Sequence, residues 1–170
     1  MLNEFVTQFG EGFVGSGVNA AHVNTVLGAK GGPVETAWAS ALAGPSQGHT
    51  PFVAVLRPGV PVQPFTLFVN KATIASDRHA QMTWGPAQAG VAKGVADAVA
   101  DGVIDRQRAD DALLIAAVWV DPQADDAQLV YVNNAQATLA ALQAGRRRLP
   151  GMDDVMAARL APFNPFFRPQ

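Results

Sequence analysis

The sequence contains no cysteine, which excludes disulfides, thiolate nucleophiles and cysteine-based metal sites. A surplus of one charge is also missing, because 12 basic residues stand against 14 acidic ones for a net charge of −2. The composition therefore lacks the electrostatic footprint of a nucleic-acid-binding protein. No stretch approaches the ~18 apolar residues of a membrane span, and the first residues lack the basic and apolar regions of a secretory signal. We expect a cytoplasmic protein that contacts neither membranes nor nucleic acids.

Several common active-site motifs are missing as well. There is no glycine-rich dinucleotide motif, no P-loop and no HExxH, and the segment Gly15-Ser16-Gly17 is a turn rather than a nucleophile elbow. The three histidines, His22, His49 and His79, are not spaced as metal ligands. We expect no metal and no permanently bound cofactor, and we expect His49 and His79 to lie on surface loops.

About half of the 170 residues are hydrophobic, which is typical of one globular domain with a sizeable core. We expect that domain over residues 1–148, followed by a proline- and phenylalanine-rich tail over 149–170 whose aromatic side chains dock on the domain or on a neighbouring subunit. Gly31-Gly32-Pro33 and Gly44-Pro45 bracket one helix, and Gly85-Pro86 opens another that Gly102 ends.

Short apolar runs between glycines and prolines predict strands. The predicted order is β-β-α-β-β-α-β-α, with strands near 13–14, 20–27, 50–56, 65–74 and 113–120 and helices near 34–42, 85–102 and 123–144. The two adjacent strand pairs disfavour a doubly wound parallel sheet. The fold class is therefore α/β of the α+β kind, a two-layer sandwich with a mixed sheet and helices on one face.

Polar residues inside these apolar strands are the candidates for chemistry. His22 and Asn24 are two apart, as are Lys71 and Thr73, so each pair shares one face of its strand. Gln88 falls in the first turn of the predicted Gly85 helix, where free N–H groups point outward. Taken alone, these residues also fit a structural histidine, an exposed strand edge and a helix cap. The sequence does not show whether the strands are neighbours.

Four motifs, in order and at similar intervals, resemble the formaldehyde-activating enzyme family. The resemblance covers roughly residues 8–145, and the motifs are Gly10-Glu11 with Val14-Gly15 up to Ala21-His22, Gly31 to Ala37, Asn70 to Ile74, and Gly85 to Ala92. By this resemblance the activity is the condensation of formaldehyde with tetrahydromethanopterin to methylene-tetrahydromethanopterin and water, in one-carbon metabolism, methylotrophy and formaldehyde detoxification. The protein would then be a carbon–oxygen lyase.

The resemblance also implies a fold like the second domain of ribosomal protein S5 and a homopentamer with pterin clefts between subunits. It makes His22 the general acid, and the residues that it places along the pterin are Asn24, Val53, Lys71, Thr73 and Gln88. An imidazole with a pKa near ~6.5 can protonate the hydroxyl that leaves the formaldehyde adduct. Tetrahydromethanopterin is a co-substrate in this reaction.

Three positions depart from the family pattern. The family carries an acidic residue at Asn24, aspartate at Ser16 and arginine at Lys30. An amide can hydrogen-bond a pterin, but it cannot hold a cationic histidine by charge. The departures indicate a divergent paralogue, and they leave a second hypothesis open: a weakly catalytic or non-catalytic protein that binds a pterin or formaldehyde for sensing or buffering.

Overall fold

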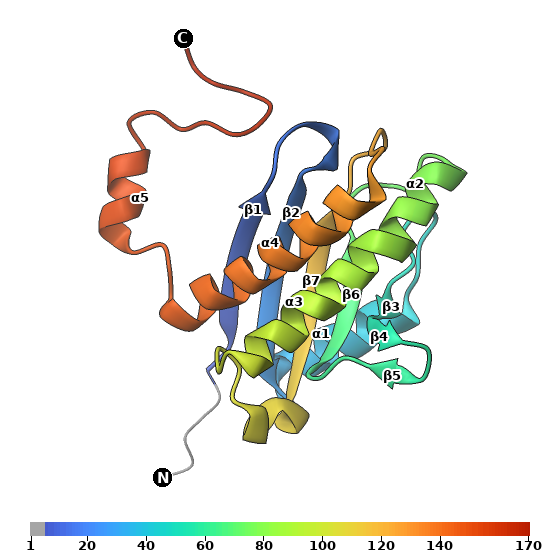
Figure 1. Cartoon of the computed structure of the whole chain (residues 1–170). Helices are drawn as coiled ribbons and strands as arrows, with labels where there is room; N and C mark the ends of the chain where they lie inside the picture. Colours follow the sequence, from blue (N-terminus) through green and yellow to red (C-terminus); the bar gives the residue numbers. More distant parts are fainter. Residues whose placement is uncertain (1–5) are drawn as a thin grey trace.

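A computed structural model describes residues 6–170 and shows a five-stranded mixed sheet (Figure 1). The strand order is β1 (Gln8–Val14), β2 (Ala21–Ala29), β7 (Ala112–Trp119), β6 (Phe65–Asn70) and β3 (Phe52–Val53). Only the β6–β7 pair is parallel among these neighbours. A separate two-stranded ribbon joins β4 (Val55–Arg57) to β5 (Val60–Pro61). The predicted mixed α+β class is confirmed.

Two long helices cover one face of the sheet. These are α3 (Gln88–Ala100) and α4 (Ala127–Arg147), which pack against each other; α4 lies over β1 and β2, and α3 lies toward β6 (Figure 1). Small residues allow the close approach: a Cβ on Gly90 or Gly94 of α3 would run into the backbone of α4. The apolar side chains of this layer include Val23, Val91 and Val95, all fully buried. Because the backbones are this close at Gly90 and Gly94, no ligand fits between α3 and α4 there.

The first helix does not follow the predicted arrangement. Helix α1 (Pro33–Ala43) has the predicted bounds within a residue, but it lies on the opposite face of the sheet, behind β2 and β7 (Figure 1). There Val34 fills the space above Gly28 of β2. Gly28 and His22 share a face of β2, since the side chains of a strand alternate. Helix α1 thus covers one end of the face that carries His22 and leaves the other end open.

The predicted Gly85 helix begins earlier than expected. Helix α2 (Asp77–Met82) is capped by Ser76, whose hydroxyl accepts from the His79 N–H, and a π-helical segment (Thr83–Ala87) continues it into α3. The π segment absorbs Pro86, which cannot continue the ordinary helical hydrogen bonds. The prediction that the helix starts at Gly85 is wrong, and Gln88 lies inside the helical stretch rather than in a first turn.

The C-terminal segment 149–170 leaves the end of α4 and turns back toward the β1–β2 end of the molecule (Figure 1). It contains α5 (Met152–Ala158), in which no residue is buried. Beyond it the chain has no helix and forms only a bridge between Asn164 and Phe167. Two short 3-10 turns complete the described elements, Gly17–Asn19 before β2 and Arg106–Asp111 before β7.

Candidate active site

The strand register brings four side chains into one line across the open face, which we call the His22 row: Phe13, His22, Trp119 and Lys71. In the ladders, His22 is paired with Phe13 of β1 on one side and with Trp119 of β7 on the other. Lys71 follows the last residue of β6, and its N–H still bonds the Val118 carbonyl at 2.8 Å. Three positions that are far apart in the sequence therefore meet around one imidazole.

Hydrogen bonds connect the row to the next pair of residues. The Lys71 ammonium donates to the Asn24 amide oxygen at 2.7 Å and lies 3.2 Å from Nδ1 of His22. On the other side of the ring, a carboxylate oxygen of Glu11 lies 2.9 Å from Nε2. An ammonium has only donors, so Nδ1 accepts a hydrogen bond from Lys71 in the neutral ring. Nε2 then carries the ring proton and donates a hydrogen bond to the Glu11 carboxylate.

Opposing influences act on the titration of the site. Burial lowers the pKa of His22 below its ordinary value, the Lys71 ammonium lowers it further, and the Glu11 carboxylate raises it. Burial also lowers the pKa of Lys71, against the pull of Glu11 in the other direction. A histidine and a lysine whose pKa values are both lowered, side by side in a cavity, are typical of a proton-transfer site.

A cavity of about 1350 Å³ opens over the row. His22, Asn24 and Lys71 line its floor together with Glu11 and Trp119, and the C-terminal segment 163–168 lines it from the other side. Phe166 meets Trp119 edge-on, with ring centroids 6.4 Å apart at 77°. The predicted docking of the tail aromatics thus has a counterpart within this chain, because one of them contacts the site.

The structure brings together only part of the predicted site. Val53, Thr73 and Gln88 are not among the residues that line the His22 cavity. Val53 pairs with Leu67 of β6, and the buried Gln88 accepts a hydrogen bond from the Val55 N–H through its side-chain oxygen. These contacts place them toward the β3 edge of the sheet, away from β1 and β2.

Thr73 does not share a strand face with Lys71, because β6 ends at Asn70. The Asn70 side chain donates to the carbonyls of Gly48 and Ala72 and turns the chain out of the sheet. The Thr73 hydroxyl then lies 3.0 Å from Nε2 of His49, whose Nδ1 lies 2.9 Å from the Asn70 carbonyl. The prediction of a Lys71–Thr73 strand pair is wrong, since a local side-chain bond outcompetes the ladder.

His79 is buried, contrary to its predicted place on a surface loop. Its Nδ1 accepts from the Ala75 N–H at 3.1 Å, so Nε2 carries the proton and donates to the Val120 carbonyl at 3.0 Å. With both nitrogens engaged by the backbone, this ring ties α2 to the end of β7. His79 has a structural role.

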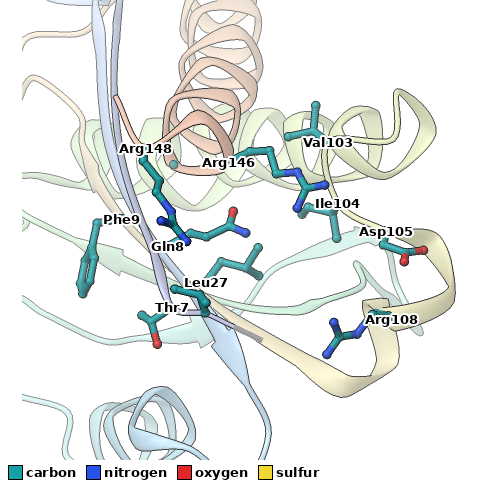
Figure 2. A pocket seen from close by; sticks show the side chains of 12 residues that line it. Thr7, Gln8, Phe9, Leu27, Val103, Ile104, Asp105, Arg108, Arg146 and Arg148 are labelled. Carbon is teal, nitrogen blue, oxygen red and sulfur yellow. The ribbon is translucent and has the colours of Figure 1, made fainter. Parts of the chain in front are cut away.

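A second cavity, of about 560 Å³, lies at the other end of the sheet (Figure 2). Figure 2 shows Arg108, Arg146 and Arg148 around it, beside Leu27 and other apolar and polar side chains. Arginine stays protonated and cannot exchange a proton with a substrate. Positive charge at the last turn of α4 is also what a helix C-terminus favours. The His22 row is therefore the candidate site for proton transfer.

The His22 row and the neighbouring Glu11 have the parts of an acid–base site: a titratable imidazole, a carboxylate on one of its nitrogens and an ammonium beside the other. Within residues 6–170, no group of three or more His, Asp or Glu side chains is placed to hold a metal ion. The helices of the same range include none whose length and hydropathy suit a membrane span.

The sequence model of the formaldehyde-activating enzymes matches residues 9–167. The chain is also 42% identical over 164 residues to the 5,6,7,8-tetrahydromethanopterin hydro-lyase of Methanosarcina barkeri, covering 96% of this chain and 92% of that protein. It is 40% identical over 159 residues to the bifunctional enzyme Fae/Hps of Archaeoglobus fulgidus, covering 94% of this chain and 40% of that longer protein. This chain belongs to the formaldehyde-activating enzyme family.

Proposed function

We propose that this chain condenses formaldehyde with tetrahydromethanopterin to methylene-tetrahydromethanopterin and water at the His22 row. The observation that carries the proposal is the imidazole held between a carboxylate and an ammonium, in a chain 42% identical to a tetrahydromethanopterin hydro-lyase. The protein is thus a carbon–oxygen lyase. The binding-only hypothesis is not favoured, because the groups needed for proton transfer are present and in contact.

The reaction needs one proton at one moment. The pterin N5 adds to formaldehyde and gives an N-hydroxymethyl adduct, whose hydroxyl leaves as water once it is protonated. His22 in its cationic form gives that proton, and the remaining iminium is closed by N10 of the pterin. The proton released from N10 returns to His22, so the ring is restored and no net proton is consumed.

Glu11, Lys71 and Asn24 together determine which nitrogen acts. Glu11 occupies Nε2, so His22 takes up its second proton at Nδ1, where Lys71 now donates. The ammonium is also held by the Asn24 oxygen, and this bond gives Lys71 a place to remain when Nδ1 carries a proton. Nδ1 is then the atom that faces the leaving hydroxyl. Asn24 serves here as a neutral acceptor for Lys71 rather than as a charge beside His22.

The aromatic wall of the cavity suits a flat heterocycle. Trp119 and Phe166 present ring surfaces next to the row, and the ring centroids of Phe13 and His22 are 6.0 Å apart. We infer that the pterin rings lie against this wall with N5 toward Nδ1. Since formaldehyde adds to amines spontaneously, the protein contributes mainly this orientation and the proton.

The pterin site extends over two subunits in our proposal. Val53, Thr73 and Gln88, the other residues that the family resemblance assigns to the pterin, do not line the His22 cavity of the same chain. A neighbouring copy that presents its β3 edge to this cavity would complete the set. Phe9 and Phe13, 68% and 41% exposed on the open face, give such a contact apolar area. A homopentamer, with a native mass of about five times 17.8 kDa, is the expected assembly.

Further parts of the proposal follow the composition of the sequence or the family resemblance rather than a contact in the structure. They are a likeness of the fold to the second domain of ribosomal protein S5, a boundary near residue 148 between the domain and the C-terminal segment, and the absence of a permanently bound cofactor. They also include a cytoplasmic location, no nucleic-acid or membrane partner, and a role in one-carbon metabolism, methylotrophy and formaldehyde detoxification.

The test is to measure methylene-tetrahydromethanopterin formation above the spontaneous rate, with His22→Ala alongside the unaltered protein. We expect the unaltered chain to exceed the spontaneous rate and His22→Ala to lose about 10²–10⁴-fold of that enhancement, the range for a general acid. His49→Ala is a matched control, since that ring is also hydrogen-bonded but does not line the His22 cavity. A chain that binds the pterin and never exceeds the spontaneous rate would disprove the lyase.

A further inference from the structure

We propose that Glu11 is a positioning residue for His22: it holds Nε2 protonated, turns Nδ1 toward the substrate, and is the carboxylate that stabilises the cationic ring. The inference rests on the proposed function, because it gives His22 a partner for the step in which the ring acts as an acid. Neither the sequence motifs nor the family resemblance assigns Glu11 a role.

The position of Glu11 follows from the register of β1 and β2. Glu11 is the ladder partner of Asn24, and Phe13 is that of His22, so Glu11 lies diagonally across from the imidazole on the same face. Side chains at this diagonal are within reach when one of them is long. The oxygen-to-Nε2 distance of 2.9 Å is that of a charge-assisted hydrogen bond.

The stability of the fold does not explain this pair. The Glu11 side chain is 60% exposed and that of His22 is 37% exposed. Ion pairs between exposed side chains contribute only ~0–1 kcal/mol to folding. The sheet edge at this place is also held by a full antiparallel ladder and by the packing of Gly10 and Gly12 against α4. The pair therefore acts on the state of the ring more than on the fold.

Glu11 is the group whose charge favours the cationic ring. The groups that face the ring or share its cavity are Glu11 from β1, Lys71 after β6, Asp121 after β7, and Arg168 from the C-terminal segment, with the neutral Asn24 on the same strand. The Lys71 ammonium disfavours a second positive charge on His22, and the neutral Asn24 has no negative charge to offset it. The Asp121 carboxylate accepts a hydrogen bond from the Gln123 N–H. The carboxylate in contact with the imidazole is that of Glu11.

The proton path fixes what Glu11 does in each half of the cycle. In the neutral ring Nε2–H donates to Glu11 and Nδ1 is unprotonated. In the cationic ring Nδ1–H is added, and the ion pair with Glu11 becomes stronger. When Nδ1 gives its proton to the leaving hydroxyl, Nε2 keeps its own. Glu11 itself neither gives nor takes a proton, and loss of its charge leaves the ring with the wrong preference for charge and tautomer.

The experiment uses Glu11→Gln, which removes the charge and keeps the shape of the side chain. The titration of His22 is followed by NMR in the protein without substrates. Removing the carboxylate takes away the influence that raises the pKa of His22, so the ring should titrate at lower pH. For an acid that must be protonated, kcat/KM falls as pH rises through that pKa, so the falling limb should move to lower pH as well. We expect kcat to drop about 10- to 100-fold, the range of a charge-assisted hydrogen bond.

Two further variants make the result specific. Glu11→Asp keeps the charge at a shorter reach and should recover part of the titration shift and of kcat. Asp97→Asn removes one carboxylate from the exposed Lys93 pair on α3 and should change neither. An unchanged His22 titration in Glu11→Gln would overturn the inference whatever the activity is. If the His22 titration moves as expected in Glu11→Gln but the unaltered chain shows no turnover, the role of Glu11 stands and the proposed function is disproved.

Discussion

The two faces of this sheet differ in what fills the space above them. Under α3 and α4 the residues are small or aliphatic and the backbones come close, as at Gly90 and Gly94. On the opposite face α1 covers one end, and at the other end polar and aromatic side chains stand around a cavity. The difference shows where the chain can bind: the covered face stabilises the fold, and the open end carries groups whose charges can change.

Among the variants that test this comparison of the two faces, the largest effect on folding is expected on the covered face, from Gly94→Val. A Cβ at Gly94 would come within 2.5 Å of the Ala135 carbonyl and 2.8 Å of the Thr138 Cβ, so α3 and α4 must separate. Overpacking of this kind costs about 1–3 kcal/mol, a factor of about 5 to 150 in the folding equilibrium. Denaturant unfolding measures the loss.

The matched control for that variant is Gly85→Ala, where a Cβ meets nothing within 4 Å. It should stay within about 0.5 kcal/mol of the unaltered protein. If the two faces are as separate as the structure indicates, kcat per folded molecule and the His22 titration remain unchanged in Gly94→Val. A large change in the titration would show that the covered face also adjusts the site.

The next effect is on the open end, from Lys71→Gln. The Lys71 ammonium lowers the pKa of His22, so its removal raises that pKa. Because the cationic ring is the active acid, it then persists to higher pH, and the falling limb of kcat/KM moves to higher pH. The lost contacts should also lower the plateau about 10-fold. Lys93→Gln, at an exposed cation of α3, should leave the profile in place, and a limb that stays fixed in Lys71→Gln would contradict the assignment of Nδ1.

The smallest effect is expected from Asn24→Asp. A carboxylate at this place would keep the bond to Lys71 and add a negative charge near His22, which favours the cationic ring. Since the site is partly exposed and Glu11 already contacts the ring, the gain in rate at neutral pH should be less than about fivefold. If Asn24→Asp raises the rate by a larger factor than Glu11→Gln lowers it, the missing charge at Asn24, rather than Glu11, limits this enzyme.

Most of the elements could be predicted because their signals are local. Apolar periodicity with Gly and Pro at the ends predicts α1 within a residue and α4 within four residues, and the apolar runs predict β2, β6 and β7. The errors arose where a side chain bonded to a backbone group and so started or ended an element. Ser76 starts the α2–α3 stretch before Gly85, and Asn70 ends β6 before Lys71 by bonding to Gly48 and Ala72.

The candidate site divided in the same way. His22, Asn24 and Lys71 were identified from polar residues in apolar strands and from family motifs, and the structure brings them together. Glu11 was not singled out, although it belongs to the first motif, because its value depends on the pairing of β1 with β2. The sequence signal that could have identified Glu11 was its position as a charged residue within a glycine-rich edge strand.

The sequence by itself determined three things about this protein: a hydrophobic core without cysteine, most of the strands and helices in order, and the motifs of the formaldehyde-activating enzymes. These depend on neighbours along the chain, which the sequence displays. Only the tertiary structure decided that His22 lies between Glu11 and Lys71, that α1 leaves one end of its face open, and that Val53, Thr73 and Gln88 lie apart from it. Strand order and register set those contacts, and they depend on residues far apart in the chain.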